Sequence, residues 1–288
     1  MTKPKKPGKP SKKSSDAAKA IVASTTGLPP HALLRIEVPH EGPLLDVTFL
    51  ADDGFVTGSE DSIRSWSPAG EPRASWGNGG GLGHSAVSRD GLLAFVEKDT
   101  IKIHTLATGD KMETFEAREP GAIAFSPDGR ILAYSSGEKL MVRDIAKQRD
   151  KGAKGGLFKG GITFSDDGRH VRYGFAFFSV KDGKFLENPP PGAVFPPDEE
   201  SVRVPDELRA PIAVAPGGRH IAGATNETAV GLYAIPARKR VALFEGHAQT
   251  VEKLAFSRDG KRLATADAAK VVVIWDVAAS LANTQSQG

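Results

Sequence analysis

The sequence of 288 residues contains no cysteine. This excludes disulfide bonds, thiolate nucleophiles and every metal site built on cysteine. The sequence also lacks a run of about 18 apolar residues, so no segment is predicted to cross a membrane as a helix. Because no apolar segment follows the N-terminal lysines, a secretory signal is not expected. The protein is therefore predicted to be cytoplasmic, or nuclear if its cell has a nucleus.

Positive charge is concentrated at the N-terminus. Residues 1–20 contain seven lysines and one acidic residue, a net +6 in a chain whose total is +3, so the other residues sum to −3. Segment 1–31 is therefore predicted to be a disordered basic tail and linker. Two functions stay open for it, a solubilising terminus or contact with nucleic acid or another polyanion. The lysines that would make that contact are Lys3, Lys5, Lys6, Lys9, Lys12 and Lys13.

Glycine and proline are abundant, and many of the glycines belong to a repeated segment. Six short segments read alike, and their final glycines are 37, 38, 39, 50 and 42 residues apart. A recurring interval near 40 residues is typical of repeat architectures. The six segments are Phe49–Gly54, Val87–Gly91, Phe125–Gly129, Phe164–Gly168, Val214–Gly218 and Phe256–Gly260.

Each repeated segment lies between short apolar runs that are predicted to be strands. Asp-Gly or Gly-Gly between two such runs indicates a hairpin, because glycine accepts the positive φ that the turn needs. After residue 30 no segment shows a sustained apolar period of 3.6 residues, so helices are expected to be minor. The pattern predicts an all-β fold.

The last repeat carries a resemblance. Residues 244–276 contain Gly-His, then Phe-Ser-x-Asp-Gly, then Trp-Asp, and in this they resemble a WD repeat. Residues 38–67 are similar, with Pro39-His40 and Trp66-Ser67 at the corresponding places, whereas the middle repeats are degenerate. The resemblance implies a WD-repeat-type β-propeller, and six turns imply six four-stranded blades.

The resemblance also predicts how the ring is completed. The chain ends soon after Trp275, without room for the outer strand of the last blade, and residues 33–38 are predicted to supply it. Such pairing would remove open sheet edges. The expected organisation is a tail and linker at 1–31, a propeller at 32–279 and a C-terminal tail at 280–288.

A buried hydrogen-bond network of His, Ser or Thr, Asp and Trp braces a blade in proteins of this family. The structural residues implied here are His40, Thr57, Trp66, His247, Thr265 and Trp275. Asp61 would complete the first set. In the last repeat the aspartate position, six residues before the tryptophan, is Ala269, so that network is expected to lack one member.

No catalytic set is identified. The His, Ser and Asp residues of the repeats lack a nucleophile turn such as Gly-x-Ser-x-Gly, and no zinc-binding spacing occurs. The glycine-rich run Gly77–Gly83 is followed by a strand-like segment rather than a helix, which favours an inter-blade loop over a phosphate cradle. The prediction is a non-enzyme with no cofactor and no metal.

A propeller scaffold is expected to bind a protein or peptide partner on one loop face. By analogy with the family, that face carries the loops that enter each inner strand and the turns between second and third strands. The predicted partner-binding residues are Asp46, Glu60, Asp61, His84, Lys98, Glu138, Lys139, Phe175, Phe177 and Lys253. The rings of Phe175, Phe177 and Phe178 either expose at least one member or all pack between blades.

The proline-rich stretch Glu187–Pro211 is a second candidate surface, expected over the same face, or else a disordered loop. Three functions remain open. The favoured one is an interaction scaffold, expected to be a monomeric propeller that works within a complex. The others are a nucleic-acid- or ribonucleoprotein-associated factor held by its tail, and a propeller enzyme, which the absent motifs disfavour.

Overall fold

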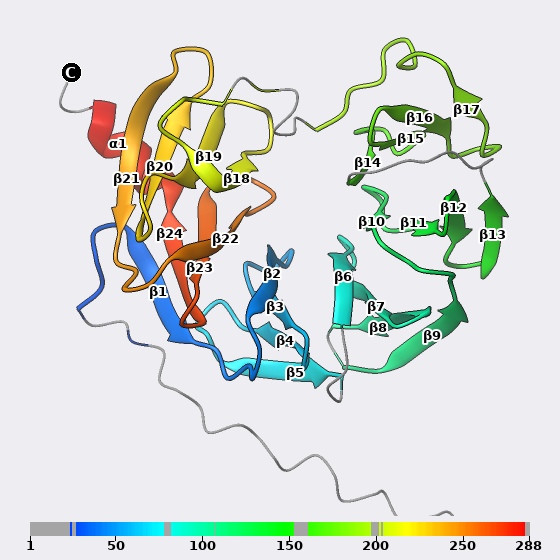
Figure 1. Cartoon of the computed structure of the whole chain (residues 1–288), viewed down its shortest axis with the longest axis horizontal. Coiled ribbons are helices and arrows are strands. Elements are labelled where there is room, and N and C mark those ends of the chain that lie inside the picture. Colours follow the sequence, from blue (N-terminus) through cyan, green and yellow to red (C-terminus); the bar gives the residue numbers. More distant parts are fainter. Residues whose placement is uncertain are drawn as a thin grey trace, which may run out of the picture.

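The computed structural model describes residues 24, 27–77, 82–106, 108–152, 161–196, 202 and 204–285. The strands form six four-stranded antiparallel sheets, which are arranged around a common centre (Figure 1). In five of the sheets the strands follow one another in chain order, so each of these blades is a β-meander. The predicted all-β class and the predicted six blades are confirmed.

The first three blades use twelve consecutive strands. Blade one comprises β2 (Leu44–Phe49), β3 (Phe55–Ser59), β4 (Ile63–Trp66) and β5 (Pro72–Trp76). Blade two comprises β6 (Leu82–Val87), β7 (Leu92–Glu97), β8 (Thr100–Thr105) and β9 (Lys111–Glu116). Blade three comprises β10 (Ile123–Phe125), β11 (Ile131–Ser136), β12 (Lys139–Asp144) and β13 (Arg149–Gly152).

The second half of the chain supplies the other three blades and a terminal helix. Blade four comprises β14 (Ile162–Phe164), β15 (His170–Tyr173), β16 (Ala176–Ser179) and β17 (Phe185–Leu186). Blade five comprises β18 (Arg209–Val214), β19 (His220–Ala224), β20 (Ala229–Ala234) and β21 (Lys239–Glu245). Blade six comprises β22 (Val251–Phe256), β23 (Arg262–Asp267), β24 (Val271–Asp276) and β1 (Ala32–Glu37), and α1 (Val277–Gln285) follows.

The N-terminal strand completes the last blade, as the sequence predicts. Strand β1 pairs antiparallel with β24, and Ile36 lies opposite Val272. The ends of the folded region differ from the expected boundaries, since Ser24 forms a bridge with Arg35. At the other end, the residues expected to begin a tail at 280 continue helix α1, in which Ser280 is buried and Leu281 packs against the core. Both additions come from packing against blade six.

The repeated turn is held by its own side chains. In blade three the Ser126 hydroxyl donates to Asp128 Oδ1 at 2.6 Å, and the same carboxylate accepts the Arg130 N–H at 3.1 Å. Gly129 closes the turn with φ 72°, a left-handed conformation that glycine adopts without steric cost. The same Ser–Asp pair recurs in the turns of blades four and six. This local bonding makes the motif recognisable in these three blades.

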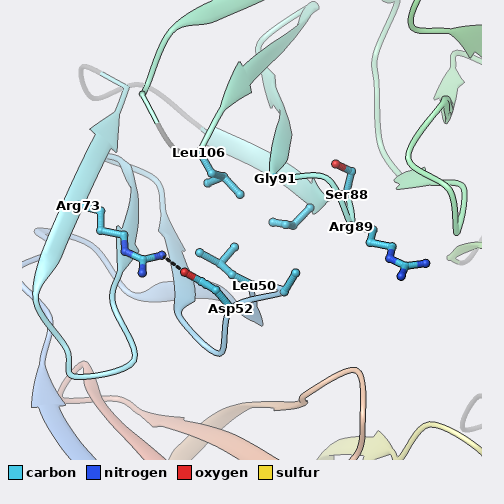
Figure 2. A pocket seen from close by; sticks show the side chains of 9 residues that line it. Leu50, Asp52, Arg73, Ser88, Arg89, Gly91 and Leu106 are labelled. Carbon is cyan, nitrogen blue, oxygen red and sulfur yellow. Dashed lines mark ion pairs between the residues drawn. The ribbon is translucent and has the colours of Figure 1, made fainter.

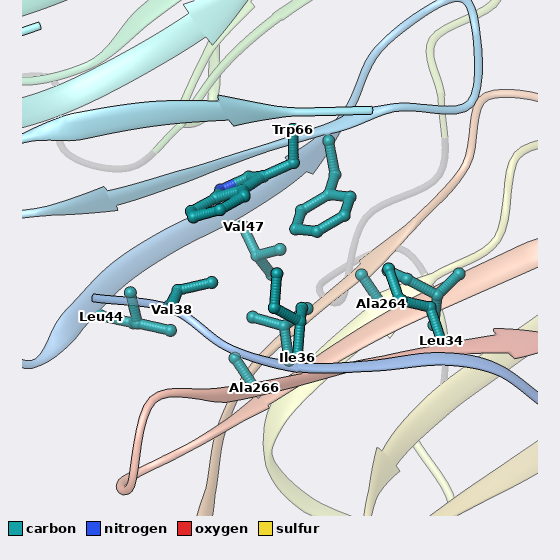
Figure 3. Close-up of a cluster of buried hydrophobic side chains, with 11 residues drawn as sticks. Leu34, Ile36, Val38, Leu44, Val47, Trp66, Ala264 and Ala266 are labelled. Atoms are coloured by element: carbon teal, nitrogen blue, oxygen red, sulfur yellow. The ribbon is translucent and has the colours of Figure 1, made fainter. Parts of the chain in front are cut away.

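The hydrophobic core lies between adjacent blades. Between blades six and one, Leu34 and Ile36 of β1 and Ala264 of β23 pack against Val47 and Trp66 (Figure 3). Further clusters join blade one to two, two to three, three to four, and five to six. Burial of this kind stabilises a fold by about 25 cal/mol per Å² of apolar surface. Each blade is therefore stable only with its neighbours.

The boundary between blades four and five is built differently. Here a cluster packs Ile221 and Tyr233 of blade five against Val202, Val204 and Leu208 from the connecting segment. The segment thus supplies apolar surface at the point where the repeat interval lengthens to 50 residues.

In the part of the chain that the structure describes, no helix has both the length and the apolar character that crossing a membrane requires.

Candidate functional site

The histidine of the last repeat sits in a complete buried network. His247 Nδ1 lies 2.9 Å from Asp267 Oδ2, and its Nε2 lies 2.6 Å from Thr265 Oγ1. The indole N–H of Trp275 donates to the same hydroxyl at 2.8 Å. Asp267 accepts from Nδ1–H, because a carboxylate has no proton to donate. The expectation that this network lacks its acidic member was wrong, since Asp267 rather than position 269 supplies the carboxylate.

The first repeat has the same network in a looser form. His40 Nε2 lies 2.9 Å from Thr57 Oγ1, which also accepts the Trp66 indole N–H at 2.9 Å. On the other side of the ring, His40 Nδ1 lies 3.3 Å from Asp61, whose side chain is 16% exposed. Burial lowers the pKa of His40 below its usual value, and Asp61 only partly opposes this effect. Both histidines therefore brace blades.

Two middle blades replace the tryptophan with other interactions. In blade two His104 stacks on Phe95 with ring centroids 5.4 Å apart, and its Nδ1 bonds the Gly109 carbonyl at 3.2 Å. In blade three Arg143 holds Glu113 of blade two and Asp150 of its own outer strand. Arg143 also lies over the Phe115 ring, 4.1 Å from its centroid. These contacts account for the loss of the sequence signature without loss of the blade.

Arg143 is the centre of a nearly buried ion cluster. Its side chain is 7% exposed and that of Glu113 is 11% exposed. Burial alone would lower the pKa of Arg143, but the hydrogen bonds that it donates to Glu113 and Asp150 outweigh that effect and raise it. The Tyr134 hydroxyl donates to Asp150 at 3.1 Å, and burial together with that carboxylate raises the tyrosine pKa. The cluster ties blades two and three together.

The two ends of the propeller carry different loops. The top face consists of the turns between the second and third strands (60–62, 98–99, 137–138, 174–175, 225–228 and 268–270) and the segments that enter the inner strands. The Ala117 N–H donates to the Asp99 carbonyl at 2.9 Å, which places such a segment beside such a turn. The bottom face consists of the repeated turns between first and second strands. Of the predicted partner-binding residues, Glu60, Asp61, Lys98, Glu138 and Phe175 lie in these turns, whereas Asp46, His84, Lys139, Phe177 and Lys253 lie in strands.

The structure gives those predicted residues different degrees of exposure. Glu60, Lys98, Glu138, Lys139 and Phe175 are exposed, whereas Asp46, Asp61, Phe177 and Lys253 are half-buried. Asp46 accepts a hydrogen bond from the Ser85 hydroxyl at 2.9 Å, so it links blade one to blade two. The side chain of His84 lies outside the described residues, as do all six lysines of the predicted polyanion contact.

The three phenylalanines of blade four have three different surroundings. Phe175 stands at the tip of the turn and is 88% exposed, while Phe178 on β16 is fully buried. Phe177 faces the other side of that strand, where its ring lies 5.5 Å from that of Phe195. One exposed ring was the first of the two alternatives, and Phe175 is that ring. Its exposure comes from its place in the turn rather than from alternation along the strand.

The proline-rich connection does not lie where it was expected. The Asp166 N–H, in a bottom-face turn, donates to the Val194 carbonyl at 2.7 Å. Phe195 packs beside blade four, and Pro196 borders a cavity at the bottom face. This part of the segment therefore reaches the bottom face and not the top. The reason is that an apolar residue of the segment, Phe195, packs against Phe177 of blade four.

Cavities were also found at the bottom face. One of about 560 Å³ lies between blades one and two and is lined by Leu50 and Leu106 (Figure 2). Arg73 and Asp52 also line it and form an ion pair at 2.6 Å. Burial would raise the pKa of Asp52, but hydrogen bonds with Arg73 and the Gly54 N–H hold it below its usual value. In the described part of the chain, no three His, Asp or Glu side chains gather where they could hold a metal ion.

Comparison with known proteins agrees with this architecture. Residues 238–276 match the model of the WD domain, G-beta repeat, a region that includes β21 to β24. No curated protein sequence matches the chain. The fold is similar to the crystal structure of the Cps50 (Swd1) β-propeller domain of Myceliophteria thermophila. The match has a TM-score of 0.63, 12% identity, and covers 83% of this chain and 98% of that one. The chain folds as a six-bladed β-propeller, and its last repeat matches the WD-repeat model.

Proposed function

We propose that this protein is a non-catalytic scaffold that binds a protein or peptide partner on the top face of its propeller. The observation that carries the proposal is Phe175, a large apolar ring that is 88% exposed at the tip of a turn. Leaving such a ring in water gains nothing for folding. Aromatic side chains are enriched among the residues that dominate binding energy at protein interfaces.

Charged residues extend this surface over neighbouring blades. Lys98 lies in the turn of blade two, Glu138 and Lys139 lie at that of blade three, and Phe175 lies in that of blade four. All four side chains are exposed, so they form an arc of mixed charge that ends in an apolar ring. Protein interfaces combine apolar anchor residues with polar and charged residues beside them. The arc therefore suits a partner with an apolar anchor and charges of both signs.

The buried positions of the repeat histidines argue against a catalytic role for them. His40 and His247 are buried and use both ring nitrogens in hydrogen bonds within their own blades. A general base must reach a substrate proton, which these side chains cannot do from the interior. His104 is likewise held against Phe95 and the Gly109 carbonyl.

The test is affinity capture from native lysate with a charge-reversed top face. The variant carries Lys98→Glu, Lys139→Glu and Phe175→Ser, three changes of exposed side chains that leave the blade cores intact. The matched control carries Arg130→Glu and Arg169→Glu on the bottom face, where the side chains are 83% and 81% exposed. Loss of the partner in the first variant alone is expected. Equal recovery by both variants would refute the assignment of the face.

The same experiment addresses the tail. Capture is repeated with a chain that lacks residues 1–20, and with nuclease present. Recovery of the same partner in all of these arms is expected if the propeller is the binding part. Recovery that collapses without the tail or after nuclease would replace the scaffold proposal with a nucleic-acid-associated factor.

A further inference from the structure

The six repeated turns bring six equivalent positions together at the centre of the bottom face. A cavity of about 710 Å³ opens there and is lined by all six blades. The third residue of every repeated turn borders it, and these residues are Ala51, Arg89, Pro127, Asp166, Pro216 and Arg258. The repeated turns therefore determine the position of the cavity, while the variable third residues determine which charged and apolar groups line it. This surface is distinct from the top face.

The two arginines at the cavity have exposed side chains. Among the described residues, no hydrogen bond or ion pair involves the side chain of Arg89 or Arg258. Basic residues elsewhere in the same turns behave differently, since Arg130 pairs with Asp128 and Arg169 with Asp167. An unpaired guanidinium beside a cavity retains all its donors for a ligand.

The charges are also arranged unevenly around the ring. Arg258 belongs to blade six and Arg89 to blade two, and blade one between them lines the cavity with uncharged residues, Thr48, Phe49, Leu50 and Ala51. In Figure 2 the side chain of Arg89 extends away from Arg73 and Leu106, toward the interior of the ring. Asp166, the one acidic lining residue among those that the structure describes, is on blade four, across the ring from blade one. Among the described residues, one side of the cavity is thus cationic, and the opposite side carries Asp166.

We propose that this cavity binds a small organic phosphate, with the phosphate held between Arg89 and Arg258. Guanidinium groups bind phosphate through paired N–H donors, and a phosphate monoester has a charge of about −1.5 to −2 at pH 7, which two arginines match. Pro127 and Pro216 offer apolar surface to the organic part of the ligand. The cavity volume lies within the range of roughly 300–1,000 Å³ that small-molecule sites occupy.

The experiment is isothermal titration calorimetry of the full-length protein with phenyl phosphate, inorganic phosphate and phenol at low ionic strength. Phenyl phosphate is expected to bind most tightly, inorganic phosphate more weakly, and phenol not at all. The double variant Arg89→Gln, Arg258→Gln should weaken phenyl phosphate at least about tenfold, which corresponds to ~1.4 kcal/mol. Asp166→Asn, which removes the opposing charge, should strengthen binding by about twofold to fivefold.

The control is Arg130→Gln, which removes an exposed arginine from the same face outside the cavity lining. It should change the dissociation constant less than about twofold, and all variants should melt like the parent because the altered side chains are exposed. The proposal is overturned if phenyl phosphate does not bind. It is overturned equally if the double variant binds as the parent does, or if Arg130→Gln weakens binding as much as the double variant.

Discussion

Replacing Asp267 with alanine tests whether the buried network of the last blade stabilises the ring. The carboxylate accepts hydrogen bonds from His247 Nδ1 at 2.9 Å and from the Ala269 and Val271 N–H groups, each at 3.0 Å. The side chains of Asp267 and His247 are both fully buried, so water cannot replace these bonds. Removing one partner of such a pair costs about 3–5 kcal/mol. We therefore expect Asp267→Ala to lower the free energy of unfolding by ~4 kcal/mol.

Asp61→Ala provides the matched comparison in blade one. Asp61 is partly exposed and lies 3.3 Å from His40, and the Ser62 hydroxyl stays 3.2 Å from the same ring nitrogen after the change. Its loss should cost about 1 kcal/mol, as for partly exposed pairs.

Thermal unfolding followed by circular dichroism measures both changes. For a domain of this size 1 kcal/mol shifts the melting temperature by about 2–4 °C, so the expected losses are about 12 °C for Asp267→Ala and about 3 °C for Asp61→Ala. Equal shifts in the two variants would refute the argument, because burial would then not decide the cost.

Four further outcomes are expected. Deleting residues 33–38 should abolish cooperative unfolding, since it exposes the edge of β24, and an unchanged melting temperature would contradict this. Arg143→Met should lower the melting temperature by about 10 °C, because it leaves Glu113 buried without its cation, and adding Glu113→Gln should restore part of the loss. Phe195→Ala should destabilise the protein by about 2–3 kcal/mol in urea unfolding if the connecting segment is anchored beside blade four. His40 has a lowered pKa, so its contribution is complete above pH ~6.5 and declines as the pH falls below that value. Stability measured from pH 7 to 5 should fall less steeply in His40→Gln than in the parent.

Much of the fold was predictable because its signals are local. In three blades the repeated turn closes on its own serine, aspartate and glycine, and the number of turns predicts the number of blades. The buried network was predicted less well. The acidic member of the last blade was expected six residues before Trp275, but Asp267 lies eight residues before it. The spacing depends on the turn between β23 and β24, whose length was not predicted from the sequence. In blade one the corresponding distance, from Asp61 to Trp66, is five residues.

The remaining features depend on contacts between distant residues. No local pattern links Arg143 to Glu113, which is 30 residues away on the neighbouring blade. The path of the connecting segment likewise follows from Phe195 meeting Phe177, and the exposure of Phe175 follows from the position of a turn.

The sequence by itself determined the number of blades, the strand that completes the last one, and the turn at the end of every inner strand. The turns and their number follow from a repeated local pattern, and the strand that completes the last blade follows from the resemblance to WD repeats. The tertiary structure decided which third residues of those turns face one cavity, how blades without tryptophan are held, and where the proline-rich segment lies. These depend on residues brought together only when six blades pack side by side, since each blade buries its apolar surface against the next.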